Sequence, residues 1–147
     1  MSLFVFTKKY PEIQRKIITN AIIDTNGISM PVRIQWDTGA TGTCISKEVV
    51  SKLQLIPIGM VNVHTPSGIG TMNQYTINLI LNNEIIFHNW VVMDSEIGKQ
   101  GIDVLIGMDI ISNGDFAISN YEGRTQFSFR IPSQEHIEYK RTNSTYK

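Results

Sequence analysis

The sequence predicts a mainly β, single-domain protein, and three observations support this prediction. The chain has 147 residues, which is the length of one domain. Isoleucine is common while alanine occurs only at Ala21, Ala40 and Ala117, and branched side chains favour strands over helices. Several apolar runs alternate with polar residues and are separated by Asn, Gly and Pro turn signals.

The first half of the chain predicts a hairpin and a short helix. A strand over residues 17–24 is followed by Asn26-Gly27, a strong hairpin signal. The next strand alternates apolar and polar residues up to Trp36, so it ends directly before Asp37. Ser46 is a suitable N-cap for a helix that ends before Pro57.

The second half predicts further strands joined by turns. The expected strands cover residues 59–65, 71–81, 84–93, 104–106, 116–118 and 126–131. Turns are expected at residues 66–70, at Asn82-Asn83 and at Glu122-Gly123, and a loop is expected over 95–101. A short helix over 108–113 precedes Gly114, and the polar residues from Pro132 onward predict a tail.

Composition excludes several classes of function. Thirteen Lys and Arg side chains balance thirteen Asp and Glu side chains, so nothing predicts binding to nucleic acid or to a membrane surface. No stretch approaches the roughly 20 apolar residues of a membrane span. The lone Cys44 fits a reducing compartment, so we expect a cytoplasmic protein. Because His64, His88 and His136 lack metal-ligand spacing, we expect no metal and no cofactor.

Two short motifs follow apolar runs and carry the chemical information. Residues 37–40 read Asp-Thr-Gly-Ala, and residues 107–109 read Gly-Met-Asp. A carboxylate at the end of a buried strand, followed by small residues, is presented at the edge of a sheet without a bulky neighbour. Alone, the first motif also fits a simple turn after a strand. We interpret Asp109 as a helix N-terminal carboxylate or a structural hydrogen-bond acceptor.

The order of these elements resembles the retropepsin family of aspartic proteases. The shared order is strand, Asp-Thr-Gly-Ala, short helix, glycine-containing hairpin, strand, Leu-Ile-Gly-Met-Asp and short helix. The sequences of these motifs are closer to those of bacterial retropepsin-like proteins than to those of retroviral enzymes. The resemblance implies a closed, barrel-like acid protease fold with one or two short helices over residues 15–131. Residues 1–14 then form an N-terminal segment and residues 132–147 a polar C-terminal tail.

The resemblance also implies roles for particular residues. Asp37 matches the catalytic aspartate, Thr38 the hydroxyl that locks two active-site loops together, and Gly39 and Ala40 the small residues of the substrate channel. The flap that covers the substrate falls on Thr65, Pro66, Ser67, Gly68, Ile69 and Gly70. The chain departs from retroviral enzymes at residues 41–42, which are Thr-Gly where those enzymes often carry acidic side chains.

A single Asp-Thr-Gly implies a shared active site. Water activation between two carboxylates needs a second aspartate, and the chain offers only Asp37, so the partner must come from a second copy across a two-fold axis. We therefore expect a homodimer that hydrolyses an extended peptide or protein substrate, with residues 3–6 or 127–131 as candidate edges of an intersubunit sheet. The alternatives are a non-catalytic module that dimerises or binds peptides, and a domain that cleaves only its own precursor.

Overall fold

The computed structural model describes residues 2–82 and 85–141, and these residues form two β-sheets with short helices between the strands. The strands are β1 (Phe4–Lys9), β2 (Ile17–Thr25), β3 (Ile28–Trp36), β4 (Cys44–Ser46), β5 (Gly59–Thr65), β6 (Gly68–Asn82), β7 (Ile85–Ser95), β8 (Val104–Ile106), β9 (Asp115–Ser119) and β10 (Gln126–Ile131). The α-helices are α1 (Lys47–Lys52) and α2 (Met108–Ile111), and the 3₁₀-helices are η1 (Glu96–Gln100) and η2 (Tyr121–Gly123).

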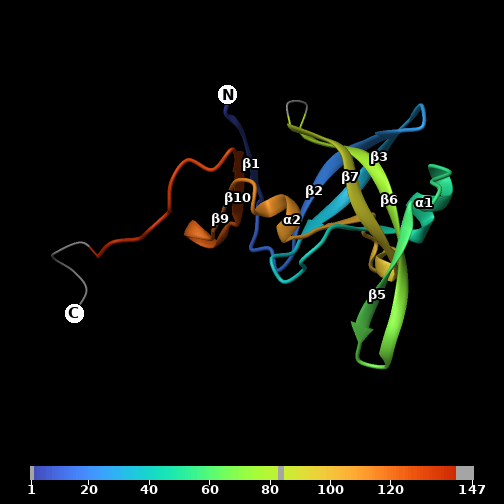
Figure 1. Cartoon of the computed structure of the whole chain (residues 1–147). Helices are drawn as coiled ribbons and strands as arrows, with labels where there is room; N and C mark the ends of the chain where they lie inside the picture. Colours follow the sequence, from blue (N-terminus) through green and yellow to red (C-terminus); the bar gives the residue numbers. More distant parts are fainter. Residues whose placement is uncertain (1, 83–84, 142–147) are drawn as a thin grey trace.

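The larger sheet closes into a six-stranded barrel. Its strand order is β2-β3-β8-β4-β7-β6, and β6 pairs again with β2 through Ile22↔Ile80 and Ile23↔Leu79. Within the described residues β5 pairs only with β6, and together they form the long hairpin that projects from the barrel in Figure 1. The predicted mainly β fold with a closed barrel and two short helices is confirmed.

The barrel core follows from the two-residue period of its strands. In β2, β3 and β6, alternate side chains are buried while those between them are more exposed. Ile23, Ile34 and Leu79 are completely buried. Burying one such aliphatic side chain stabilises the fold by about 1.5–3 kcal/mol, so the alternating pattern also sets which face of each strand points inward.

A second sheet packs against one side of the barrel through aromatic rings. Its order is β1-β10-β9, and Figure 1 shows it beside the barrel. Trp36, the last residue of β3, contacts Phe127 and Phe129 of β10 with ring centroids 4.9 and 5.1 Å apart. The proposal that residues 127–131 form an intersubunit edge is wrong, because both edges of β10 are paired within the chain.

Local predictions are largely confirmed, with three differences. Asn26 and Gly27 both have positive φ, as the expected hairpin turn requires, and the Ser46 hydroxyl caps α1 by accepting the Val49 N–H at 3.2 Å. The expected loop at 95–101 is mostly η1, the helix expected at 108–113 ends at Ile111, and β6 begins at Gly68 rather than at residue 71. The expected turn at 82–83 lies partly outside the described residues.

The start of the polar tail is fastened to the second sheet by Asp115. Its carboxylate accepts the Gln134 backbone N–H at 2.8 Å, the Ser133 hydroxyl at 2.5 Å and the Arg130 guanidinium at 2.7 Å. These donors hold the pKa of the Asp115 carboxyl well below its usual range. Beyond this anchor the chain has no helix or strand as far as residue 141, and it runs away from the body in Figure 1.

Candidate active site

Asp37 lies at the point where β3 ends, on a loop that is fastened to the neighbouring strand. Its N–H donates to the Ile106 carbonyl of β8 at 2.9 Å, so the loop begins from a fixed position. The Gly39 N–H donates to Asp37 Oδ1 at 2.8 Å, and the Ala40 N–H donates to the Asp37 carbonyl at 3.2 Å. These contacts hold the half-buried carboxylate against its own loop, while Thr38 and Gly39 are exposed.

The second motif lies directly against this loop. The Met108 N–H donates to the Ala40 carbonyl at 2.8 Å, and the Asp109 N–H donates to the Thr41 carbonyl at 3.2 Å. A Cβ atom on Gly107 would lie 2.6 Å from the Gly42 carbonyl oxygen. Such a contact is too short for any side chain, so glycine is required at position 107 for the two segments to approach.

Asp109 joins three segments around the loop. Its carboxylate accepts the Thr43 hydroxyl at 2.7 Å, the Thr43 N–H at 3.1 Å, the Trp90 indole N–H at 3.0 Å and the Ile110 N–H at 3.0 Å. Asp109 therefore connects the active-site loop, strand β7 and helix α2. Its predicted role as a structural hydrogen-bond acceptor is confirmed.

Thr43 and Trp90 are supporting residues whose contacts the sequence did not reveal. Thr43 is only 1% exposed, and its hydroxyl also accepts the Gly107 N–H at 3.2 Å. The half-buried ring of Trp90 packs against the core and its indole N–H also contributes a polar contact to Asp109. No local signal could identify either role, because Thr43 meets a partner 66 residues further along the chain.

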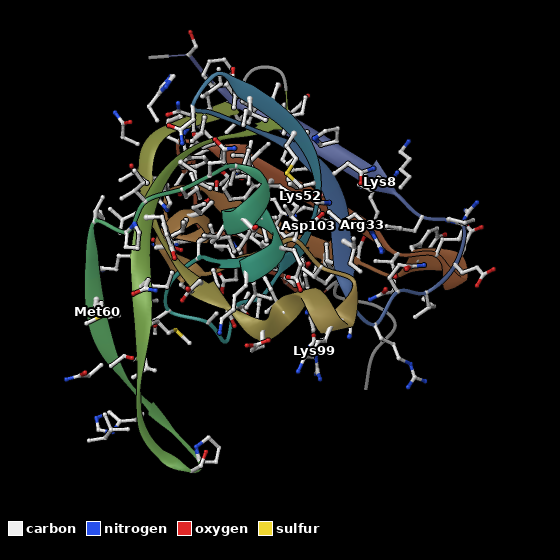
Figure 2. All side chains as sticks on the ribbon, turned by 90° about the vertical axis from the view of Figure 1, so that its right-hand side faces the viewer. Lys8, Arg33, Lys52, Met60, Lys99 and Asp103 are labelled. Atoms are coloured by element: carbon white, nitrogen blue, oxygen red, sulfur yellow. The ribbon has the colours of Figure 1, made fainter. Side chains whose placement is uncertain are left out.

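The hairpin expected to act as a flap stands apart from the loop in the single chain. Its turn consists of Pro66 and Ser67, and Thr65 pairs with Gly68. Figures 1 and 2 both show the tip projecting beyond the barrel. Met60 and Ile69 are 69% and 70% exposed, so this hairpin presents large apolar side chains. The structure thus groups residues 37–40 with 107–109 and leaves 65–70 separate.

The neighbouring thiol is not an alternative nucleophile. Burial raises the pKa of Cys44, and the carboxylates of Asp109 and Asp94 raise it further. The thiolate is therefore disfavoured beside this loop. Within residues 2–82 and 85–141, no group of three or more His, Cys, Asp or Glu side chains is placed to hold a metal ion. No helix in the same ranges is long and apolar enough to cross a membrane.

The barrel, the Asp-Thr-Gly-Ala loop and the glycine block against it define a retropepsin-like aspartic protease. A retropepsin-like aspartic protease from Rickettsia conorii superposes with a TM-score of 0.57 at 18% identity, over 88% of this chain and 96% of that chain. The EIAV protease complexed with the inhibitor HBY-793 superposes with a TM-score of 0.51 at 13% identity, over 68% of this chain and 88% of that chain. At these identities the likeness concerns the fold alone.

Sequence comparison places the chain in a family. The model of the gag-polyprotein putative aspartyl proteases matches residues 21–113, well over half of the chain, and the protein belongs to this family. No curated protein sequence matches it.

Proposed function

We propose that this protein is an aspartic endopeptidase in which two Asp37 carboxylates of a homodimer activate a water molecule. The observation that carries this proposal is the position of Asp37. It lies on a loop held by hydrogen bonds to Ile106, Met108 and Asp109, with its carboxylate partly open to solvent. A carboxylate on a rigid, solvent-facing loop is a suitable base for water.

The chemistry follows from bringing two such loops together. Two carboxylates about 3 Å apart do not both ionise easily, so the pair holds one proton between them. The ionised member takes a proton from water as the water attacks the peptide carbonyl. The protonated member donates to the carbonyl oxygen, and in the resulting tetrahedral intermediate the pair of carboxyl groups returns a proton to the amide nitrogen as the C–N bond breaks and the amine leaves. None of these steps requires a metal or a covalent intermediate.

The second copy supplies the missing carboxylate, because the chain contains one Asp-Thr-Gly. In the single chain the Thr38 side chain is exposed beside Asp37. We assign this hydroxyl to contacts between the two loops, and Gly39 and Ala40 to the channel where the substrate backbone passes. Closure of the β5–β6 hairpin over the peptide would add backbone hydrogen bonds and exclude water.

The test is the substitution Asp37→Asn, which keeps the shape of the side chain but removes the base. Purified protein is incubated with a denatured protein mixture from acid to neutral pH, with and without pepstatin. We expect the wild type to cleave and the variant to lose about 10³-fold or more of the rate, with an unchanged thermal melt and an unchanged sedimentation coefficient. Wild-type activity in Asp37→Asn would remove Asp37 from the mechanism.

The same assay separates the alternatives. Pepstatin-sensitive cleavage of the mixture supports a general endopeptidase, and cleavage restricted to a longer precursor of this chain supports a processing domain. A folded dimer that cleaves neither substrate at any pH would favour the non-catalytic module. A monomer that still cleaves peptide would contradict the shared pair of carboxylates.

A further inference from the structure

The outer edge of β1 is open for pairing with another strand. On one side β1 pairs with β10, and no other strand among residues 2–82 and 85–141 pairs with it. Tyr10 directly follows β1 and continues its register opposite Thr125. Its N–H donates to the Thr125 carbonyl at 2.9 Å. Because antiparallel hydrogen bonds alternate, the even-numbered residues face β10. The backbone N–H and C=O groups of Val5, Thr7 and Lys9 therefore point outward.

A groove of about 560 Å³ borders this open edge at its middle, around Thr7. Phe6, Thr7 and Lys8 of β1 line it together with Asn20 of β2 and Arg33 of β3. Asn20 and Arg33 are exposed cross-strand neighbours on the outer surface of the barrel. Figure 2 shows Lys8 and Arg33 next to each other in that view. The groove is thus bounded by an unpaired strand edge, by polar side chains and by the apolar side chains of Phe6, Ile18 and Leu81.

The charge of the groove has one sign. Lys8 and Arg33 are the charged residues that line it, and both are positive. Neither forms an ion pair with a carboxylate of the described residues. Asp103 accepts the Arg33 backbone N–H at 2.8 Å, whereas the guanidinium donates to the Gly101 carbonyl at 3.2 Å. The Lys8 ammonium lies over the Tyr10 ring, 5.8 Å from the ring centroid, so neither cation is neutralised by a carboxylate and both can attract an acidic ligand.

We propose that this groove binds an extended acidic segment of a partner protein, which adds to the sheet as a strand beside β1. Main-chain hydrogen bonds to Val5, Thr7 and Lys9 would hold the segment. Lys8 would attract its carboxylates from β1 and Arg33 from the barrel side. Side chains of a strand alternate between two faces, so the acidic residues should occupy alternate positions of the segment.

A second copy of this chain fits the groove less well than an acidic segment. Pairing through β1 would bring a second Lys8 and a second Lys9 to a groove that already carries Lys8 and Arg33, and like charges at short range repel. The proposal does not depend on the peptidase activity, since neither Asp37 nor the β5–β6 hairpin lines this groove.

The binding test uses labelled peptides and the full chain. The probe is a hexapeptide that alternates glutamate and valine, and fluorescence anisotropy at low salt measures its affinity. Two controls have the same length: one alternates lysine and valine, and one carries its three glutamates consecutively. We expect the alternating acidic peptide to bind about tenfold more tightly than either control, and to weaken as salt increases.

Two protein variants separate strand addition from simple attraction of charge. Thr7→Pro removes the outward N–H without touching the ladder to β10, and Thr7→Ala is its control, because both lose the 2.7 Å contact between the Thr7 and Ser128 hydroxyls. We expect Thr7→Pro to weaken binding about tenfold and Thr7→Ala to change it little. The charge reversals Lys8→Glu and Arg33→Glu should each weaken binding about tenfold.

A peptide methylated on alternate backbone nitrogens tests the same pairing with the wild-type protein, so the test does not depend on how Thr7→Pro folds. Methylation of the nitrogens that face β1 should abolish binding, with amide NMR shifts on Val5, Thr7 and Lys9 for the parent peptide. The proposal would be overturned if the peptides with alternating and with consecutive glutamates bound equally well. It would also be overturned if methylation of either set of nitrogens left binding unchanged, or if the NMR shifts were confined to other strands. Absence of binding at millimolar peptide would overturn it as well.

Discussion

Replacing Asp109 should reveal how much of the active-site loop depends on one carboxylate. Asp109→Ala leaves the Thr43 N–H, the Thr43 hydroxyl and the Trp90 indole N–H without their acceptor. Thr43 is 1% exposed, so water reaches its groups poorly, and each unsatisfied buried group costs about 1–3 kcal/mol. Trp90 is half-buried, so leaving its indole N–H without an acceptor costs less free energy. The expected loss is about 3–5 kcal/mol of unfolding free energy.

Asp109→Asn should lower the free energy of unfolding less than Asp109→Ala does, because the amide keeps part of the carboxylate's contacts. The amide keeps one acceptor oxygen, and placing that oxygen at Oδ2 preserves the contacts to the Thr43 N–H and the Trp90 indole. The amide nitrogen then takes the place of Oδ1, where the Thr43 hydroxyl can rotate and accept from it. The Thr43 hydroxyl proton loses its acceptor, while the Ile110 N–H still donates to the Gly107 carbonyl at 3.2 Å, so we expect a loss of about 1–2 kcal/mol.

Thermal and urea unfolding at pH 7 measure the difference. For a chain of this size the two substitutions should lower Tm by about 10 °C or more for alanine and about 5 °C or less for asparagine. Asp24→Ala is the matched control, because Asp24 is exposed on a strand and should change Tm by less than about 2 °C. Equal shifts for alanine and asparagine at position 109, or an alanine shift no larger than the control, would refute the reasoning.

Three further perturbations test other parts of the structure. Gly107→Ala should destabilise the fold by about 2–4 kcal/mol and reduce peptidase activity, because the added Cβ would meet backbone atoms. In the control Gly59→Ala the added Cβ meets only a flexible side-chain oxygen at 3.1 Å, so this variant should fold normally. Urea unfolding compares the two variants. Asp115→Asn should lower Tm at pH 7, and the difference in Tm from the wild type should shrink below about pH 4. A carboxyl whose pKa is lowered in the folded state stabilises the fold above its unfolded-state pKa and loses that contribution as the pH falls. A difference in Tm that stays unchanged down to about pH 2 would contradict this. Amide exchange at 65–71 should slow when a peptide-like inhibitor binds, and identical exchange would show that the hairpin is only a turn.

The sequence was sufficient for features that depend on local pattern. The alternation that ends at Trp36 predicted a strand that delivers Asp37 at its end, and the structure has this strand. The Ser46 cap and the Asn26-Gly27 turn were also predictable, because both rely on contacts or torsion angles within a few residues.

Features that depend on distant partners could not be predicted. The contact of Trp90 with Asp109 joins residues 19 positions apart, and nothing in either local sequence indicates it. Residues 127–131 carry apolar side chains at alternate positions and were expected to pair between subunits. The sequence does not show that strands from both ends of the chain flank them. Pairing partners are a tertiary property, so an apolar strand indicates burial but not its neighbours.

The second sheet has a consequence for the order of folding during synthesis. Phe4 pairs with Ile131, so nearly the whole chain separates the two strands of this ladder, while β2 and β3 are joined by a tight turn. Closing a long loop carries a larger entropic penalty than closing a short one. Strand β1 leaves the ribosome before the barrel strands but has no partner until β10 has been made. The barrel strands are therefore expected to assemble earlier, and β1 to dock only after β10 has emerged.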